Sequence, residues 1–281
     1  MTRRALLQAA SSLAAFAQAP VSRLSGSRVR IALNCFSFDR PLRDGSMTLP
    51  EVVRFCARHG IDGLDATGYY FPGYPQAPDA DYVRNLKREA FVNGVTIMGT
   101  GVRNDFTLPD PAARRESVDL VKRWIETAAG LGASVIRVFS GAGVPAGHTF
   151  DEVLAWMTPA FAECVEHGRK YGVIVGLQNH DDFVKTAGDT IRVLRAVNSE
   201  WFGLILDVGS LRQRELYGEI EKLVPYAVSW QLKENVDLRK LKAIIDAAGY
   251  RGFLPIETLG PGDPAAKVTK FLAEVRAVFA A

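Results

Sequence analysis

Eight short runs rich in β-branched and aromatic residues alternate with longer segments of helical periodicity from Arg28 onward. This alternation is typical of strand–helix–strand units around a parallel sheet. A closed barrel needs eight such units, whereas an open doubly wound sheet more often has about five or six. The sequence therefore predicts an α/β fold, a single (β/α)8 TIM barrel. The predicted strands are 29–34, 61–67, 95–100, 134–140, 173–178, 202–207, 228–233 and 253–258.

Glycines mark the expected ends of the helices between these strands. Helical periodicity predicts helices over 111–131, 150–171 and 240–248. Glycine takes the left-handed C-cap conformation without a steric cost, so a glycine just before the next strand indicates where a helix stops. The glycines in this position are Gly60, Gly94, Gly132, Gly172 and Gly249.

The composition fits one large globular domain that acts on a small polar molecule. The chain has 281 residues, 48% of them hydrophobic, and no linker rich in Pro, Gly or Ser divides it, so we expect one barrel over 28–281. The net charge of +3 comes from mixed acidic and basic residues, which does not favour a nucleic-acid partner. Cys35, Cys56 and Cys164 lack CxxC spacing, so we predict neither disulfides nor structural zinc.

The first 27 residues have the pattern of an export signal and a short leader. Arg3 and Arg4 precede an apolar run from residue 5 to 17 and small residues up to Ala19, and "TRRALLQ" resembles a twin-arginine signal. The run is shorter than the about 20 residues of a membrane span, so we expect no stable membrane insertion. This pattern predicts a periplasmic protein cut after Ala17 or Ala19. The alternative is an amphipathic N-terminal helix on a cytoplasmic protein.

Polar residues close four consecutive strands of the predicted barrel. In a (β/α)8 barrel the carboxyl ends of the strands converge on one pocket. Strand five stops at Gln178-Asn179-His180, strand six at Asp207, strand seven at Gln231 and strand eight at Glu257. We therefore expect four oxygen-bearing side chains to face one point: Gln178, Asp207, Gln231 and Glu257.

Several motifs around these positions resemble the xylose isomerase-like barrels, the sugar phosphate isomerase and epimerase group, over Arg28 to Phe279. They are "GIDGLDATGYYFP", "GASVIRVFSG", "YGVIVGLQNHDDF", "LILDVGS", "WQLKE" and "YRGFLPIETLG". In that family a divalent ion is held by a glutamate, an aspartate, a histidine and a glutamate that end strands five to eight. The resemblance carries two of these roles directly, to Asp207 and Glu257. The chain departs from the pattern at Gln178 and Gln231, and Ser210 replaces a histidine often found three residues after the aspartate.

What the resemblance implies about a cofactor depends on these two amides. Amide oxygens can bind hard cations, so the expected cofactor is a divalent cation, Mn, Mg or Ca, with Gln178, Asp207, Gln231 and Glu257 as ligands and no nucleotide cofactor. The alternative is a barrel that has lost its metal, in which the amides hydrogen-bond to each other or to a substrate hydroxyl.

The chemistry implied is proton transfer at a carbon next to the carbonyl of a sugar or keto-sugar. Glu257 is the candidate base. Because Gln178 cannot take a proton, two-base epimerisation is disfavoured against one-base isomerisation or elimination, and His180 is a candidate for the second proton transfer. Lys233 is a third catalytic candidate that holds an anionic oxygen, or else a rim lysine paired with Glu234.

Four further residues are predicted to bind substrate hydroxyls, and an aromatic loop is a candidate wall for the sugar ring. Arg137 either contacts substrate or buttresses the carboxylates from within the barrel. The loop aromatics Tyr69, Tyr70, Phe71 and Tyr74 either line the pocket or pack beneath the loop. The predicted substrate-binding residues are Asn179, Arg137, Arg103 and Asn34.

The leading hypothesis is thus a sugar isomerase or epimerase, with a keto-sugar lyase or hydratase as runner-up. The partner is a small-molecule carbohydrate, and a homo-oligomer is possible. The competing hypothesis is a non-catalytic sugar-binding barrel with a degenerate metal site. The segment "GAGVPAG" follows a strand but has the wrong spacing for a dinucleotide site, and four scattered histidines do not provide the zinc cluster of related DNA-repair barrels.

Overall fold

The computed structural model describes residues 19–180, 183–211 and 213–279. The predicted export signal falls largely on residues 1–18, which lie outside the described residues. The expectation of periplasmic export therefore stays a prediction.

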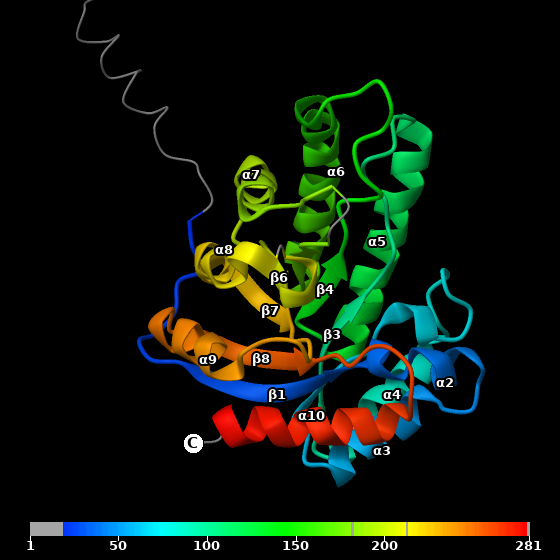
Figure 1. Cartoon of the computed structure of the whole chain (residues 1–281). Coiled ribbons are helices and arrows are strands. Elements are labelled where there is room, and N and C mark those ends of the chain that lie inside the picture. The colour runs from blue at the N-terminus through cyan, green and yellow to red at the C-terminus, as the bar shows by residue number, and fades with distance from the viewer. Residues whose placement is uncertain (1–18, 181–182, 212, 280–281) are drawn as a thin grey trace, which may run out of the picture.

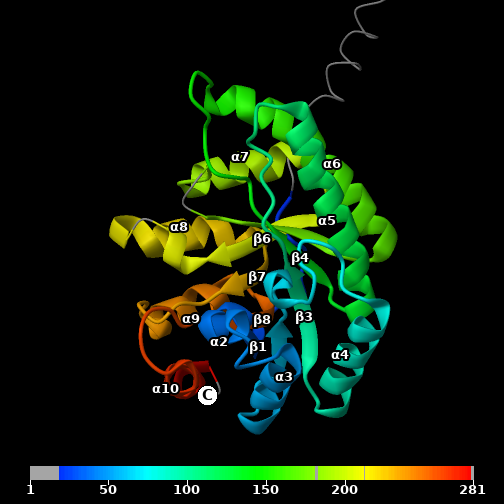
Figure 2. The same cartoon turned by 90° about the vertical axis from the view of Figure 1, so that its right-hand side faces the viewer.

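Eight parallel strands form one nearly closed barrel, which confirms the predicted (β/α)8 fold (Figure 2). Neighbours in sequence are neighbours in space from β1 to β7, and β8 returns to pair with β1 in register from Arg28↔Arg251 to Leu33↔Ile256. The strands are β1 Arg28–Asn34, β2 Gly63–Asp65, β3 Thr96–Gly101, β4 Val135–Val138, β5 Ile174–Gln178, β6 Phe202–Asp207, β7 Ala227–Gln231 and β8 Arg251–Ile256.

The seam between β7 and β8 closes the barrel by an isolated parallel bridge, Leu232↔Ile256. Two backbone hydrogen bonds cross it: Leu232 N–H donates to Pro255 O and Glu257 N–H donates to Leu232 O, each at 2.8 Å. Pro255 lies inside β8 and has no N–H to donate, which limits the ladder at this point.

Helices surround the strands on the outside of the barrel (Figure 1). They are α2 Asp39–Arg43, α3 Leu49–Arg58, α4 Ala80–Val92, α5 Pro111–Leu131, α6 Phe150–Tyr171, α7 Ala187–Val197, α8 Leu216–Leu223, α9 Leu238–Ala247 and α10 Pro264–Phe279. Short 3-10 turns follow several strands or precede others: η1 Cys35–Phe38, η2 Gly68–Tyr70, η3 Val208–Ser210, η4 Gln213–Glu215 and η5 Val224–Tyr226.

The helix boundaries follow their caps. Helices α5 and α6 have the predicted limits, and Gly132 and Gly172 end them in the left-handed region with φ of 78° and 69°. Helix α9 begins two residues before its predicted start, because the Asp237 side chain accepts hydrogen bonds from the amides of Arg239 and Lys240. Gly60, Gly94 and Gly249 also have positive φ, which confirms the predicted stop signals.

The core lies between the strands and the inner faces of the helices. Trp124 on α5, Phe161 on α6 and Phe202 on β6 are among the largest fully buried side chains. Phe161 packs against Phe202 with ring centroids 5.0 Å apart, which fixes α6 on the sheet. Cys35, Cys56 and Cys164 are buried free thiols.

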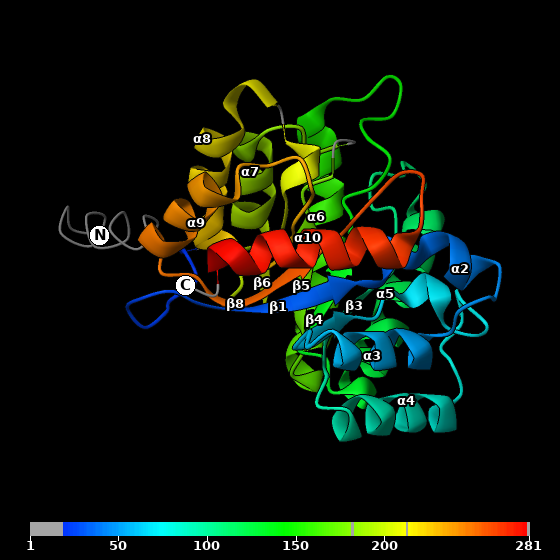
Figure 3. The same ribbon diagram turned by 60° about the horizontal axis from the view of Figure 1, so that its bottom comes forward.

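The N-terminal segment before β1 and the last helix, α10, pack on the outside of the barrel. Residues 21–27 run beside α8 and α9, where Val21 N–H donates to Pro225 O at 2.9 Å and the Arg23 guanidinium lies 5.1 Å from the Tyr250 ring centroid. Helix α10 lies across β8 and β1 (Figure 3). Its Arg276 donates to the carbonyls of His59 and Gly60 at 2.7 and 2.6 Å, which ties α10 to the end of α3. Within the described residues, no helix is long and apolar enough to span a membrane.

Candidate active site at the carboxyl ends of the strands

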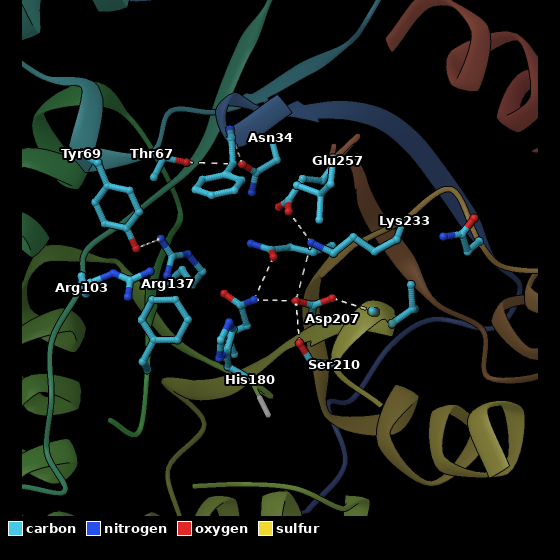
Figure 4. A pocket seen from close by; sticks show the side chains of 18 of the residues that line it. Asn34, Thr67, Tyr69, Arg103, Arg137, His180, Asp207, Ser210, Lys233 and Glu257 are labelled. Atoms are coloured by element: carbon cyan, nitrogen blue, oxygen red, sulfur yellow. Dashed lines mark hydrogen bonds and ion pairs between the residues drawn. The ribbon is translucent and has the colours of Figure 1, made fainter. Parts of the chain in front are cut away.

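A pocket of about 380 Å³ lies where the strands end, a volume within the range of small-molecule sites (Figure 4). Its lining carries both signs of charge. Asp207, Glu257 and Lys233 lie on one side, and Arg103 and Arg137 lie on the other.

The centre of the acidic side is an ion triad of Lys233, Asp207 and Glu257. The Lys233 ammonium contacts Glu257 Oε1 directly and lies 3.7 Å from Asp207 Oδ2. The side chain of Lys233 is 14% exposed, that of Asp207 3% and that of Glu257 6%, so the triad is largely shielded from solvent. The alternative of a rim lysine paired with Glu234 is wrong, because the ion pair of Glu234 is with Lys267 at 3.7 Å.

Two amides complete the acidic side. Gln178 Nε2 donates to Asp207 Oδ2 at 2.7 Å and to Gln231 Oε1 at 2.9 Å. A flipped Gln178 amide would place its oxygen against the Asp207 carboxylate, acceptor against acceptor, so the carboxylate fixes the direction of the amide. The two amides therefore hydrogen-bond to each other, and Gln178 also hydrogen-bonds to Asp207.

The backbone after β6 holds the Asp207 carboxylate in place. Gly209 N–H donates to Asp207 Oδ1 at 2.9 Å, and Ser210 Oγ donates to Asp207 Oδ2 at 3.2 Å. Asn179 joins β5 to this point: its Nδ2 donates to Asp207 O and its Oδ1 accepts from Asp207 N, both at 2.8 Å. Both polar atoms of Asn179 are thus used on backbone, and Asn179 does not line the pocket. We therefore correct its predicted role from substrate contact to strand positioning.

The basic side consists of a buried guanidinium between aromatic rings. Arg137 donates to Tyr69 OH at 2.7 Å and lies 4.4 Å from the Phe139 ring centroid. The exposed Arg103 guanidinium lies over the same two rings at 5.9 and 5.7 Å. His180 meets Phe139 edge to face at 5.2 Å and also lines the pocket. This side presents donors to substrate oxygens at a distance from the carboxylates.

A buried carboxylate, Asp65 at the end of β2, lies behind the pocket. Asn34 Nδ2 donates to Asp65 Oδ2 at 3.1 Å, while Asn34 Oδ1 accepts from Phe36 N at 2.8 Å. Burial raises the pKa of Asp65 to about 6, although Arg137 lowers it; the charge of Glu257 raises it further. Asn34 lines the pocket, but these bonds already use both polar atoms of its side chain.

The environment of Glu257 raises the proton affinity of its carboxylate. Burial raises the pKa of the Glu257 carboxyl above its usual value, and this effect outweighs the lowering by the Lys233 ammonium. Asp207 raises the pKa of Glu257 further through like charge, and Arg137 lowers it. A carboxylate with a raised pKa binds a proton more strongly than an ordinary glutamate.

These residues do not fit a divalent ion as they stand. The position between the two carboxylates is filled by the Lys233 ammonium, and the Gln178 amide turns its N–H group, not its oxygen, toward Asp207. Two unit charges 4 Å apart near a protein surface interact by about 4 kcal/mol, so an ion of charge +2 there would meet roughly twice that repulsion from the ammonium. Among the described residues, no group of three or more His, Cys, Asp or Glu side chains is placed to hold a metal.

The sequence matches the family model of the xylose isomerase-like TIM barrel over residues 53–275. The chain belongs to this family. No curated protein sequence matches the chain.

Solved structures with this fold include sugar epimerases. A D-psicose 3-epimerase in the presence of D-fructose has a TM-score of 0.78 at 12% identity, covering 90% of this chain and 100% of the other. The D-psicose 3-epimerase with D-tagatose from Clostridium cellulolyticum H10 has a TM-score of 0.76 at 14% identity, covering 89% and 99%. The IolI protein with a bound zinc atom has a TM-score of 0.72 at 14% identity, covering 90% and 100%. At these identities the likeness establishes the fold.

The xylose isomerase-like barrel brings most of the predicted site residues into one pocket. Of the aromatic loop, only Tyr69 lines the pocket, because Phe71 and Tyr74 pack on Trp124 and Tyr70 donates to Asp39. Arg137 contacts neither Asp207 nor Glu257 directly. The predicted residues that line the pocket are Gln178, Asp207, Gln231, Glu257, Lys233, His180, Arg137, Arg103 and Asn34.

Sequence reasoning missed two residues of the xylose isomerase-like site. Asp65 ends β2 in "GLDAT", so the rule that polar strand ends converge could have found it. The Phe139 ring packs against Arg137 and His180 on the basic side of the pocket. In the sequence, Phe139 lies at the end of an apolar strand, and nothing there distinguishes it from a core residue.

Proposed function

We propose that this protein is a carbohydrate-active enzyme that moves a proton at a carbon next to a carbonyl, with Glu257 as the base. The observation that carries the proposal is the buried Glu257 with a raised pKa, next to a cation, in a pocket of small-molecule size. The sugar epimerases among the solved structures support a sugar substrate.

The proposed step starts with transfer of the proton from the carbon to the Glu257 carboxylate. The electron pair of the broken C–H bond moves to the carbonyl oxygen and gives an enediolate. Lys233 and, across the pocket, Arg103 and Arg137 provide positive charge for this oxyanion and for substrate hydroxyls. Return of the proton to the neighbouring carbon, together with a hydroxyl proton shift, completes an isomerisation.

The same first step leads to a lyase or hydratase if a group on the next carbon leaves. Gln178 favours one-base isomerisation or elimination over two-base epimerisation, because an amide does not take up a proton near neutrality. His180 lines the pocket and is the candidate that returns or donates the second proton.

The test is solvent deuterium exchange into a panel of ketoses, aldoses, 3-keto-sugars and sugar acids, followed by NMR and mass spectrometry. We expect deuterium at the carbon next to the carbonyl of at least one sugar. Glu257→Gln should lower this exchange by about 10²- to 10⁴-fold, the usual contribution of a general base.

Glu234→Gln is the matched control, because Glu234 lies on the rim and pairs with Lys267. It should exchange at nearly the parental rate. Exchange by Glu257→Gln at the parental rate would remove Glu257 from the role of base. Saturable sugar binding without any exchange would favour the non-catalytic binding barrel.

We also propose that the enzyme acts in the periplasm after twin-arginine export. The support is the paired arginines and apolar run before Ala19. Mass spectrometry of the native protein should find a mature N-terminus at residue 18 or 20. An N-terminus at Met1 or Thr2 would contradict export.

A further inference from the structure

The acidic side of the pocket already contains a cation. The Lys233 side chain leaves the end of β7 and points between Glu257 and Asp207 (Figure 4). Both carboxylates are nearly buried, so each needs a positive charge or hydrogen-bond donors close by. The ammonium supplies the charge, and Gln178, Ser210 and the Gly209 amide supply the donors to Asp207.

The absence of a side chain at Gly209 leaves room for the Lys233 side chain. A Cβ atom on residue 209 would lie 2.9 Å from Lys233 Cγ and 3.1 Å from Lys233 Cε, so a larger residue there would displace the lysine stem. Gly209 has no positive φ, so backbone conformation does not require glycine at this position. Close contact with the lysine stem is thus the physical reason for glycine at 209.

The two glutamines match a cation of charge +1. With Asp207 and Glu257 as the anions and Lys233 as the cation, the triad carries one net negative charge. Gln178 partly compensates this charge by donating an N–H to Asp207. A carboxylate at position 178 would face Asp207 Oδ2 at hydrogen-bond distance and repel it. The neutral amides therefore suit a single ammonium, whereas a divalent ion would favour more anionic ligands.

We propose that the Lys233 ammonium is the resident cation of this site, and that the enzyme works without a divalent metal. In this arrangement Lys233 binds the carbonyl oxygen of a hydroxy-ketone or hydroxy-aldehyde substrate. It stabilises the negative charge that develops there when Glu257 takes the proton. This inference rests on the proposed function for its catalytic part, but its cation part can be measured without any substrate.

The test compares Mn²⁺ binding by the wild-type protein and Lys233→Met, with titration calorimetry and the EPR signal of free Mn²⁺. Methionine keeps an unbranched stem but removes the charge. The wild type should bind Mn²⁺ weakly, with Kd above the millimolar range. Lys233→Met should bind at least tenfold more tightly, because two carboxylates lose their cation. Lys267→Met, which removes the rim lysine next to Glu234, should bind like the wild type.

Lys233→Arg provides a second variant in case the methionine variant does not fold, which circular dichroism will show. The arginine keeps a cation between the carboxylates, so it should keep the weak Mn²⁺ binding of the wild type. Deuterium exchange by the wild type should persist in EDTA.

Three outcomes would overturn the proposal. They are stoichiometric micromolar Mn²⁺ binding by the wild type, equal Mn²⁺ affinity in the wild type and Lys233→Met, and loss of deuterium exchange in EDTA. A protein that exchanges no sugar at all would instead contradict the proposed function and leave the Mn²⁺ comparison valid.

Discussion

The protonation of Asp65, behind the pocket, should make the stability of the fold depend on pH. Its folded-state pKa of about 6 lies above the ordinary 3.8, because burial favours the neutral acid. A raised folded-state pKa contributes stability below about pH 4, and this contribution is lost as the pH rises through about 6. Two pKa units correspond to about 3 kcal/mol, so ionised Asp65 should lower the free energy of unfolding by about that amount at neutral pH.

Asp65→Asn removes this titration while the side-chain oxygen can still accept from Asn34. We expect its stability relative to the wild type to increase between pH 4 and pH 7.5, measured by urea unfolding at each pH. Asp62→Asn, an exposed carboxylate on the same segment, is the control for loss of one charge. A pH-independent difference between Asp65→Asn and the wild type would contradict the raised pKa.

At the residue scale, the sequence identified which side chains meet but not how they are bonded. The ends of β5 to β8 were predictable because parallel strands converge, and Gln178, Asp207, Gln231 and Glu257 do line one pocket. The direction of the Gln178 amide and the contact of Lys233 with both carboxylates depend on side-chain torsions and on space at Gly209. Spacing along a sequence contains no information about such torsions.

At the scale of one element, the glycine at the end of β3 leaves the space that the Arg137 side chain occupies. A Cβ atom on Gly101 at the end of β3 would lie 2.7 Å from Arg137 Nε and Nη2. Arg137 is buried and donates to Tyr69, so it has little room to withdraw. Gly101→Ala should therefore destabilise the fold by about 1–3 kcal/mol and raise the KM of the proposed sugar reaction.

Gly99→Ala in the same strand is the matched control for this prediction. Its Cβ would meet its nearest neighbour, Val135 O, at an ordinary 3.4 Å. Urea unfolding and exchange kinetics of the two variants separate the effects. Equal stability and equal KM in both variants would mean that Arg137 moves without cost.

Elements with strong periodicity and clear caps were predicted best. Helices α5 and α6 agree at both ends, because an Asp110 or Thr149 cap and a final glycine are local signals. Strand β2 is shorter than predicted, Gly63–Asp65, because its backbone shifts register against β3 at Leu64/Asp65. Such a shift arises from pairing between distant segments, which the sequence of one strand does not contain.

At the scale of the whole molecule, the last residues of the predicted leader pack against the barrel. Residues 21–27 contact the barrel through the Val21 amide, the Arg23 guanidinium on Ala227 O and Tyr250, and the Ser27 hydroxyl on Asp246. A cut after Ala17 or Ala19 would retain all of these contacts.

A chain shortened to begin at Arg28 should therefore be less stable by about 3 kcal/mol, because it loses these three hydrogen bonds and a net hydrogen bond contributes about 1 kcal/mol. A chain that begins at Pro20 should unfold at the same urea concentration as the full chain. Equal midpoints for the two shortened chains would mean that residues 20–27 add nothing to the fold.

The β7–β8 seam links the shape of the barrel to the contact between Lys233 and Glu257. Lys233 and Glu257 stand on opposite sides of a seam that an isolated bridge joins, so any elastic widening of the barrel at this point draws the ammonium away from the carboxylate. Because Lys233 lowers the pKa of Glu257, that movement would raise the proton affinity of this proposed base. The width of this seam would therefore set both the Lys233–Glu257 contact and the proton affinity of Glu257.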